Sequence, residues 1–325
     1  MQMFRLVFAA LVGAALIGVT DSASAQTFPA RPVTLIVPYA AGGPTDTIAR
    51  IVGDRMGQAL GQPVVIENVA GAAGTIAAAR VARAAPDGYT MFIATWSSHV
   101  VSPVIYRLSY DVFRDFAPVI WLTQTPLMLV SKKDIPATNL KELVAWLKAK
   151  PEPALLGNAG GTDQVAGYLL QQKTGANIQL VPYRGLAPAM QDLVAGRIDL
   201  LFDQPSDALP QLKSGAIKAY AVTADKRAAV APEVPTVDEA GFPGLHIAPW
   251  HSLWLPKGAP DAAIAKLNGA AMAALADPAV RQRLTAVGQE VVPPNEQTPM
   301  ALAAHYKAET DTWWPIIKAA GLKAE

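Results

Sequence analysis

The chain has 325 residues, of which 27 are basic and 26 acidic, so its formal net charge is +1 and charged residues make up only 16% of it. No basic stripe is interleaved with aromatic residues, so the sequence lacks the electrostatic footprint of a nucleic-acid-binding protein. It contains no cysteine, which excludes disulfides, thiolate metal sites and a lipoprotein anchor.

The first 25 residues predict a cleaved signal peptide and no part of the fold. Arg5 precedes an apolar core, Leu6–Val19, of about fourteen residues, which is short for a membrane span of roughly twenty. Ala23-Ser24-Ala25 then gives the small-residue cleavage pattern. We expect cleavage after Ala25 and export to the periplasm, with an uncleaved anchor helix as the alternative.

Downstream, short apolar runs alternate with segments of helical period. Uninterrupted apolar runs are typical of parallel strands that are covered on both faces, and the alternation predicts an α/β fold with parallel sheets. The expected strands are Val33–Val37, Val64–Glu67, Thr90–Ala94, Val119–Leu122, Leu127–Ser131, Ile178–Pro182, Ile198–Phe202, Ala219–Thr223 and Ser252–Leu255.

Helices are expected between the strands and in the C-terminal tail. Thr138 is expected to cap a helix with an apolar face from Leu140 to Leu147, and Asp277 with Pro278 to open another. The most regular apolar face, at helical spacing, is Ile48, Ile51, Val52, Met56, Ala59 and Leu60.

The pattern divides into two βα-type blocks and a mostly helical tail. We expect one domain from residues 26–125 plus 250–325 and a second from residues 126–249, because the tail should pack back onto the first block. The chain would then cross between the domains near 123–126 and 249–253.

Two Gly-rich loops stand between an apolar run and a helix. The first is VPYAAGGPTDTIARIV, Val37–Val52, and the second is LLGNAGGTDQVAGYLL, Leu155–Leu170. A helix N-terminus favours an anion by roughly 0.3–1 kcal/mol, and by about 2 kcal/mol where it is partly buried. One such end cannot supply micromolar affinity, about 8 kcal/mol, whereas two ends closing on one ligand could.

Catalytic, nucleotide and metal signatures are absent from the sequence. It contains no Walker A, G-x-G-x-x-G, G-x-S-x-G, S-x-x-K or H-E-x-x-H pattern. Ser97-Ser98-His99 is the strongest hydrolase candidate, although neighbours on one loop rarely meet in triad geometry. His246 and His251 have no acidic ligand close in sequence. We therefore expect no catalytic residue, no metal site and no cofactor.

Motifs spread over residues 28–325 carry a specific resemblance. They include FPARPVTLIVPYAAGGPTDTIAR, GQPVVIENVAGAAGT, ARAAPDGYTMFIAT, VPYRGLAPAMQDLVAGRIDLLFD, AVTADKR, EVPTVDEAGFPG and LNGAAMAALADPAVRQRL, in this order. The chain resembles the TctC-like (Bug) substrate-binding receptors of tripartite tricarboxylate transporters. The resemblance implies a two-domain type II periplasmic-binding-protein fold that closes on a small carboxylate and delivers it to membrane permease subunits.

The resemblance also implies which residues contact the ligand. These fall on the two Gly-rich loops, on the loop after the third strand and at one strand end. They are Tyr39, Ala41, Gly42, Gly43, Thr45, Asp46, Trp96, Ser97, Ser98, His99, Gly161, Thr162, Asp163, Gln164 and Asp203.

Some positions depart from the family pattern and leave the ligand open. Gln164 stands where a histidine is usual, and Trp96 where small residues are usual. Trp96 and Trp250 could stack on an aromatic acid or simply pack at the hinge, and Arg184 is the nearest candidate cation. Dicarboxylates, tricarboxylates, acidic amino acids and aromatic acids all stay candidates. We expect a monomer; a sensor for a two-component system is the alternative to transport, and a periplasmic hydrolase a weaker one.

Overall fold

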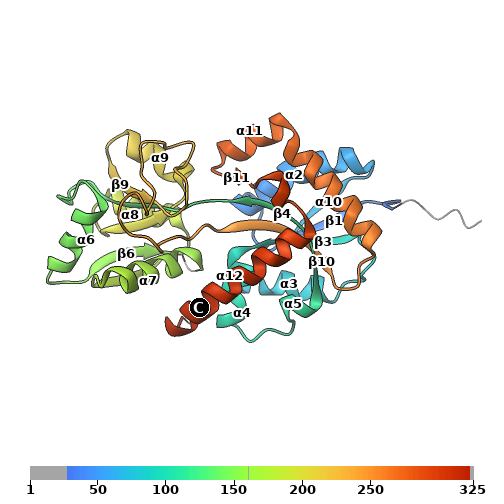
Figure 1. Cartoon of the computed structure of the whole chain (residues 1–325), viewed down its shortest axis with the longest axis horizontal. Coiled ribbons are helices and arrows are strands. Elements are labelled where there is room, and N and C mark those ends of the chain that lie inside the picture. Colours follow the sequence, from blue (N-terminus) through green and yellow to red (C-terminus); the bar gives the residue numbers. More distant parts are fainter. Residues whose placement is uncertain (1–27, 160, 323–325) are drawn as a thin grey trace, which may run out of the picture.

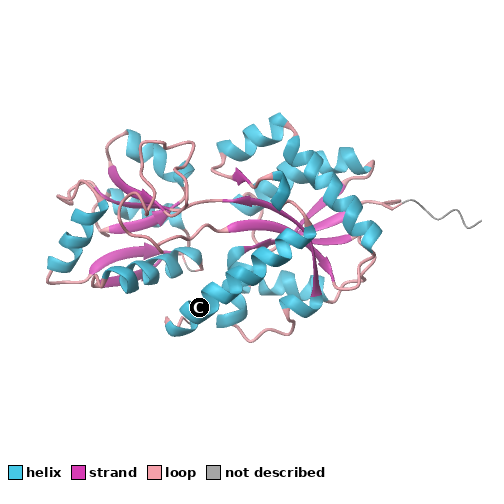
Figure 2. Ribbon diagram, in the orientation of Figure 1, coloured by secondary structure: helices cyan, strands magenta, loops and turns pink. Residues whose placement is uncertain are grey.

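The computed structural model describes residues 28–159 and 161–322 and has two α/β lobes side by side, joined by two extended segments (Figures 1 and 2). The predicted signal peptide lies outside the described residues. The first lobe holds a six-stranded sheet in the order β11-β4-β10-β3-β1-β2, and the second a five-stranded sheet in the order β7-β6-β8-β5-β9. This is the expected α/β class with two lobes.

The first lobe combines segments from both ends of the chain. Its strands are β1 (Val33–Val37), β2 (Val64–Asn68), β3 (Thr90–Thr95), β4 (Phe116–Gln124), β10 (Trp250–Pro256) and β11 (Glu290–Val291). Its helices are α2 (Pro44–Leu60), α3 (Thr75–Ala82), α4 (Ser102–Ile105), α5 (Val112–Asp115), α10 (Asp261–Ala276), α11 (Pro278–Ala286) and α12 (Pro299–Ala319). The C-terminal helices pack back on this lobe, α10 against α2 and α12 against β4.

The second lobe is built from the middle of the chain. Its strands are β5 (Met128–Lys132), β6 (Ala154–Asn158), β7 (Ile178–Pro182), β8 (Leu200–Asp203) and β9 (Ile217–Val222). Its helices are α6 (Leu140–Ala149), α7 (Thr162–Thr174), α8 (Leu186–Val194) and α9 (Pro205–Lys213). The strands of each sheet lie on either side of the expected crossing points, while the domain boundaries themselves stay a prediction.

The expectation of parallel sheets is confirmed only in part, because both sheets are mixed. The β1–β2, β1–β3, β6–β7 and β6–β8 pairs are parallel. However, β10 lies antiparallel between β3 and β4, and β5 antiparallel between β8 and β9. Each of these two strands enters its sheet directly from the other lobe without a crossover helix, so neither is bound to the parallel direction that a βαβ unit imposes.

Helix α2 illustrates how sequence pattern becomes packing. Its apolar face, including Ile48, Val52 and Met56, is buried against the sheet and α10. Gly43 is its N-cap, and Pro44 occupies the first turn, where a missing N–H costs nothing. The helix therefore begins at the Gly-rich loop and directs its N-terminus at the end of β1.

Two capping predictions have different outcomes. Asp277 caps α11 as expected, and its side chain accepts the N–H groups of Ala279 and Val280. Thr138 does not cap α6: Asn139 does, by accepting the N–H of Glu142 at 3.0 Å. Thr138 instead donates its own N–H to the Glu142 side chain at 2.7 Å, so both polar residues before this helix are used.

Within the two described ranges, none of the helices combines the length and the apolarity needed to cross a membrane.

Candidate functional site

A cleft of about 630 Å³ lies between the lobes, where loops from both meet the second connecting segment. Most of these loops follow the carboxyl ends of parallel strands, which is the usual place for a ligand in open α/β sheets. The lining residues are Tyr39, Ala40, Ala41, Gly43, Pro44, Thr45, Thr95, Trp96, Ser97, Leu127, Ala159, Thr162, Asp163, Arg184, Gly185, Leu186, Gln204, Pro249, Trp250 and His251.

The first Gly-rich loop is shaped by a buried carboxylate at the start of α2. Asp46 has a side chain only 3% exposed, and it accepts the Gly42 N–H at 2.8 Å, Arg50 Nε at 2.9 Å and Asn68 Nδ2 at 3.0 Å. The hydrogen bond from Arg50 is the main reason that the pKa of Asp46 is lowered, to about 2. Gly42 has φ of +85°, a conformation that glycine adopts without strain. The loop is therefore fixed from within before any ligand arrives.

The second Gly-rich loop repeats this device at the start of α7. Asp163 accepts the N–H of Ala159, four residues earlier, just as Asp46 accepts that of Gly42. Gly161 has φ of +64°, and a Cβ there would lie 2.7 Å from Ser97 Oγ of the other lobe. Glycine is thus required at this position both by the backbone and by the close approach of the lobes.

A hydrogen bond joins the lobes at the back of the cleft. Ser97 Oγ and Thr162 Oγ1 lie 3.2 Å apart. A second cavity of about 430 Å³ adjoins the cleft and shares Tyr39, Ser97 and Ala159 with it. Gln164, one of the two residues that depart from the family pattern, lines this second cavity.

The residues expected to contact a ligand fall into three groups. Those that line the cleft are Tyr39, Ala41, Gly43, Thr45, Trp96, Ser97, Thr162 and Asp163. Those that line only the adjoining cavity are Gly161 and Gln164. Those in neither lining are Gly42, Asp46, Ser98, His99 and Asp203. Ligand contact by any of them stays a prediction.

The Ser98 and His99 pair is buried behind the cleft. Ser98 Oγ lies 3.3 Å from His99 Nδ1, but both residues are fully buried. The His99 ring packs against Phe92 and Trp254, and burial lowers its pKa to about 3. Ser98 is bonded to the backbone of Thr95 in both directions. The pair therefore serves the fold of this loop, and a substrate has no path to it in this arrangement.

His251 is a cleft residue that the sequence did not single out for this role. Its Nε2 lies 3.2 Å from Thr45 Oγ1 and its Nδ1 3.4 Å from Thr123 Oγ1, which in turn donates to Gln289. Burial lowers the pKa of His251 to about 4, so the ring is neutral at pH 7. The sequence feature that could have indicated this role is the position of His251 at the start of β10, the strand that returns from the second lobe.

The two tryptophans of the cleft share one acceptor behind it. Trp96 Nε1 donates to Glu309 Oε2 at 2.6 Å and Trp250 Nε1 donates to the same oxygen at 3.3 Å. Both indoles are fully buried. Glu309 belongs to α12, and burial raises its pKa. Both indoles are thus fixed at the junction of the lobes, whereas their contact with an aromatic ligand stays a prediction.

Asp203 lies beneath the second-lobe side of the cleft, with 2% of its surface exposed. Burial, together with the nearby carboxylates of Asp207 and Asp163, raises its pKa to about 7. Its carboxylate accepts the Gln204 N–H at 2.8 Å. A proton on this carboxyl group therefore stabilises the folded chain.

We expect Asp203→Asn to stabilise the protein at alkaline pH. A carboxyl group whose pKa is raised on folding contributes stability at low pH that is lost as the pH rises through the folded value, here about 7. The variant should gain up to about 4 kcal/mol over the wild type at pH 8 and little at pH 4, since one pKa unit corresponds to about 1.4 kcal/mol. Urea unfolding at both pH values measures the difference. Asp134→Asn, an exposed carboxylate of the same lobe, is the control, and a pH-independent difference for Asp203→Asn would contradict the assignment.

Comparison with known proteins gives consistent matches along most of the chain. Residues 48–322 match the family model described as the tripartite tricarboxylate transporter family receptor. A UPF0065 protein from the TAR-I ttuE-ttuC' intergenic region of Agrobacterium vitis is 40% identical over 91% of this chain and 86% of its own length.

Two solved structures from Rhodopseudomonas palustris have the same fold. MatC (Rpa3494) with bound malate is 39% identical, with a TM-score of 0.77 over 89% of this chain and 100% of its own. Rpa4515 with adipate is 35% identical, with a TM-score of 0.79 over 91% of this chain and 99% of its own.

Proposed function

The chain belongs to the tripartite tricarboxylate transporter receptor family, and from this premise we propose that it captures a small carboxylate in its interdomain cleft and delivers it to a membrane permease. The observation that carries the proposal is that α2 and α7, one from each lobe, begin at the same cleft. Receptors of this family are binding proteins and not enzymes. Export rests on the signal-peptide pattern of residues 1–25, and we propose a periplasmic monomer.

Two helix N-termini and one arginine supply the attraction for an anion. The first-turn N–H groups of a helix have no acceptor within the helix, and partly buried ends favour an anion by up to about 2 kcal/mol each. Arg184 adds a cation to the lining, and no ion pair in the described part of the chain involves it. A guanidinium can bind a carboxylate with two parallel hydrogen bonds. These contributions hold an anion without a basic surface.

Closure of the lobes would complete the site. The lobes are joined by two extended segments, and a ligand that contacts both lobes shifts the population toward the closed form. The Ser97–Thr162 contact already brings the α7 loop against the first lobe. A closed form that a permease recognises would then report that the cleft is occupied.

Dicarboxylates are the first ligands to test. MatC with malate and Rpa4515 with adipate indicate that this cleft type accepts linear diacids of different length. Here one carboxylate would lie between the two helix ends and the other toward Arg184. Calorimetry of residues 26–325 against malate, adipate, citrate, glutamate and benzoate should give at least one dissociation constant in the micromolar range. Failure of every acid to bind more tightly than about 1 mM would overturn the proposal.

We expect Arg184→Met to weaken binding of the preferred diacid at least tenfold. Loss of a charge-assisted, partly desolvated pair costs about 1.5–3 kcal/mol, and a tenfold change corresponds to about 1.4 kcal/mol. Arg197→Met removes the same charge from the outer surface of the same lobe, where Arg197 pairs with Asp192 in solvent, and should leave affinity unchanged. Equal affinities for both variants would remove Arg184 from the site.

A further inference from the structure

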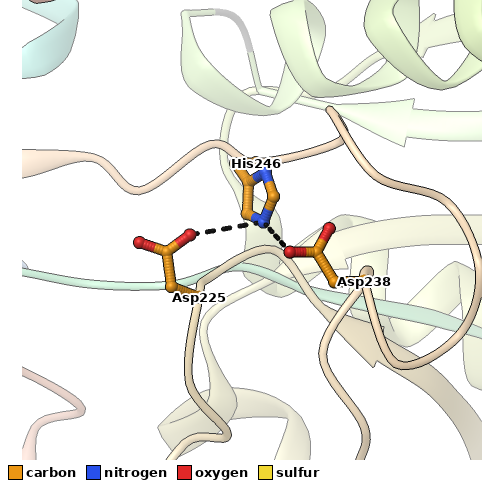
Figure 3. Close-up of side chains that lie close together, drawn as sticks. All are labelled: Asp225, Asp238 and His246. Atoms are coloured by element: carbon orange, nitrogen blue, oxygen red, sulfur yellow. Dashed lines mark ion pairs between the residues drawn. The ribbon is translucent and has the colours of Figure 1, made fainter.

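A cluster of three potential metal ligands lies in the second lobe, apart from the cleft. Asp225 lies in the turn after β9, Asp238 in a turn of the following loop, and His246 in the segment that leads into β10 (Figure 3). None of the three lines the cleft or the cavity beside it. From the geometry of this cluster we propose that it binds one divalent transition-metal ion, with Zn²⁺ as the best fit.

The separations within the cluster match a metal coordination shell. His246 Nε2 lies 3.4 Å from Asp225 Oδ1 and 3.2 Å from Asp238 Oδ2, and the three ligand atoms all lie within 4.8 Å of one another. Metal–ligand bonds of about 2.0–2.2 Å in a tetrahedron place neighbouring ligand atoms roughly 3.3–3.6 Å apart. The two separations from His246 Nε2 therefore already fit such a shell, and the two carboxylate oxygens lie within 4.8 Å of each other.

The orientation of the imidazole distinguishes this cluster from a simple ion pair. The His246 side chain is about a third exposed, yet its Nε2 atom is buried and makes no hydrogen bond, although both carboxylates are near it. Figure 3 shows Nε2 directed between the two carboxylate groups. A ring nitrogen directed between two carboxylate oxygens is the arrangement that a shared cation would use.

Backbone hydrogen bonds hold the ligand-bearing segments in place without a metal. Ile247 N donates to Thr223 O at 3.0 Å, and Thr223 Oγ1 donates to Ile247 O at 2.6 Å, which fixes the residue next to His246 on the end of β9. The end of β9 also accepts the N–H of Val237 at 2.9 Å, and this bond fixes the residue before Asp238. The backbone beside His246 and Asp238 is thus held before binding, which lowers the entropy cost of coordination, whereas the Asp225 side chain, 90% exposed, would be ordered by the ion.

The chemistry of the ligand set selects the metal. One imidazole nitrogen and two carboxylate oxygens suit Zn²⁺ and its neighbours Co²⁺ and Ni²⁺, whereas Ca²⁺ takes six to eight oxygens and Cu(I) prefers sulfur. Two carboxylates neutralise the charge of the divalent ion, and the exposed side of the cluster leaves a position for water. Such an ion would tie the segment that enters β10 to the second lobe and stabilise that lobe without contacting the cleft.

The test is calorimetric titration of the untagged protein, stripped with chelator, with ZnCl₂ and separately CoCl₂ in a buffer free of carboxylates. We expect one equivalent of Zn²⁺ to bind with a micromolar or lower dissociation constant, and Co²⁺ to give the visible absorption of a four-coordinate ion. Zn²⁺ should also raise Tm. His246→Gln and Asp238→Asn should each weaken binding at least tenfold and lose the Tm increase.

Glu233→Gln is the matched control, because Glu233 is an exposed carboxylate of the same loop outside the cluster. It should bind Zn²⁺ like the wild type. The proposal is overturned if the wild type binds no Zn²⁺ or Co²⁺, or if one-equivalent binding persists unchanged in His246→Gln. Affinity for the preferred diacid, measured in chelator, should be equal in all these variants, so failure of the metal site and failure of the receptor proposal are distinguishable.

Discussion

Replacing Asp46 with alanine should lower the free energy of unfolding by about 2–4 kcal/mol and weaken ligand binding more than tenfold. The buried Asp46 carboxylate accepts three hydrogen bonds, from Gly42, Arg50 and Asn68. Charge-assisted bonds contribute about 1.5–3 kcal/mol each where they are buried, and the half-exposed Arg50 contributes less. Gly43 and Thr45 lie between Gly42 and Asp46 and line the cleft. The cleft should therefore lose its shape when the bonds of Asp46 are lost.

The pH dependence gives a second readout for the same residue. The pKa of Asp46 is lowered to about 2, so its contribution to stability is present above about pH 4 and is lost as the pH falls toward 2. Asp46→Asn keeps an acceptor for the Gly42 N–H but loses the charge on which Arg50 depends. It should fall between the wild type and Asp46→Ala in urea unfolding at pH 7 and approach the wild type near pH 2.

The control for this residue lies on the same helix. Asp54 is an exposed carboxylate of α2, and Asp54→Asn should change neither the midpoint of unfolding nor the affinity measured by calorimetry. An Asp46→Ala protein as stable as Asp54→Asn would show that the loop does not depend on its buried carboxylate. Normal stability with weakened binding would instead make Asp46 a direct ligand contact, as the family resemblance implies.

Most of the fold could be predicted because it depends on local apolar periodicity. Val33–Val37 and Ile178–Pro182 are strands with the predicted bounds. The strand Ala154–Asn158 was not predicted: it carries Gly157 and Asn158, which are poor strand formers, so only an apolar run before a loop could be recognised there. The antiparallel direction of β5 and β10 could not be predicted. It follows from the chain crossing between the lobes just before each strand, and the residues of a strand do not encode that crossing.

The cleft loops could be predicted, but the roles of individual side chains could not. Asp46 and Asp163 stand at the right helix starts, yet each folds back onto its own loop. Whether such a carboxylate bonds to its own loop or to a ligand depends on the backbone geometry of the loop within a few ångströms of it. His251 meets Thr45 across 206 residues of sequence, and Trp96 meets Glu309 across 213. Contacts of such separation arise from how β10 and α12 pack on the first lobe, which no local pattern encodes.

The same packing makes Glu309→Leu the second substitution with a large expected effect. It removes the acceptor shared by the Trp96 and Trp250 indoles, and each buried N–H left without a partner costs about 1–3 kcal/mol. We expect the free energy of unfolding to fall by about 2–4 kcal/mol. Trp96 and Trp250 are both lining residues of the cleft, so affinity for the preferred acid should fall as well.

Glu309→Gln separates the hydrogen bonds from the charge. The amide oxygen can still accept from an indole, so this variant should lose less than half of the stability that Glu309→Leu loses in urea unfolding at pH 7. Burial raises the pKa of Glu309 above its ordinary value of 4.5, so its proton is favoured by folding and the wild type loses stability as the pH rises from about 4.5 through the folded value. The neutral amide lacks this dependence, so the gap between the wild type and Glu309→Gln should narrow at higher pH.

A matched control on α12 tests whether any substitution in this helix lowers stability. Asp311 is two residues along and forms an exposed pair with Lys307, so Asp311→Asn should change stability by less than about 0.5 kcal/mol. Tryptophan fluorescence adds a readout that a general loss of stability would not move, because freed indoles change their emission in the folded state. If Glu309→Leu matched Glu309→Gln in stability, emission and affinity, the shared acceptor would have no part in holding the cleft wall.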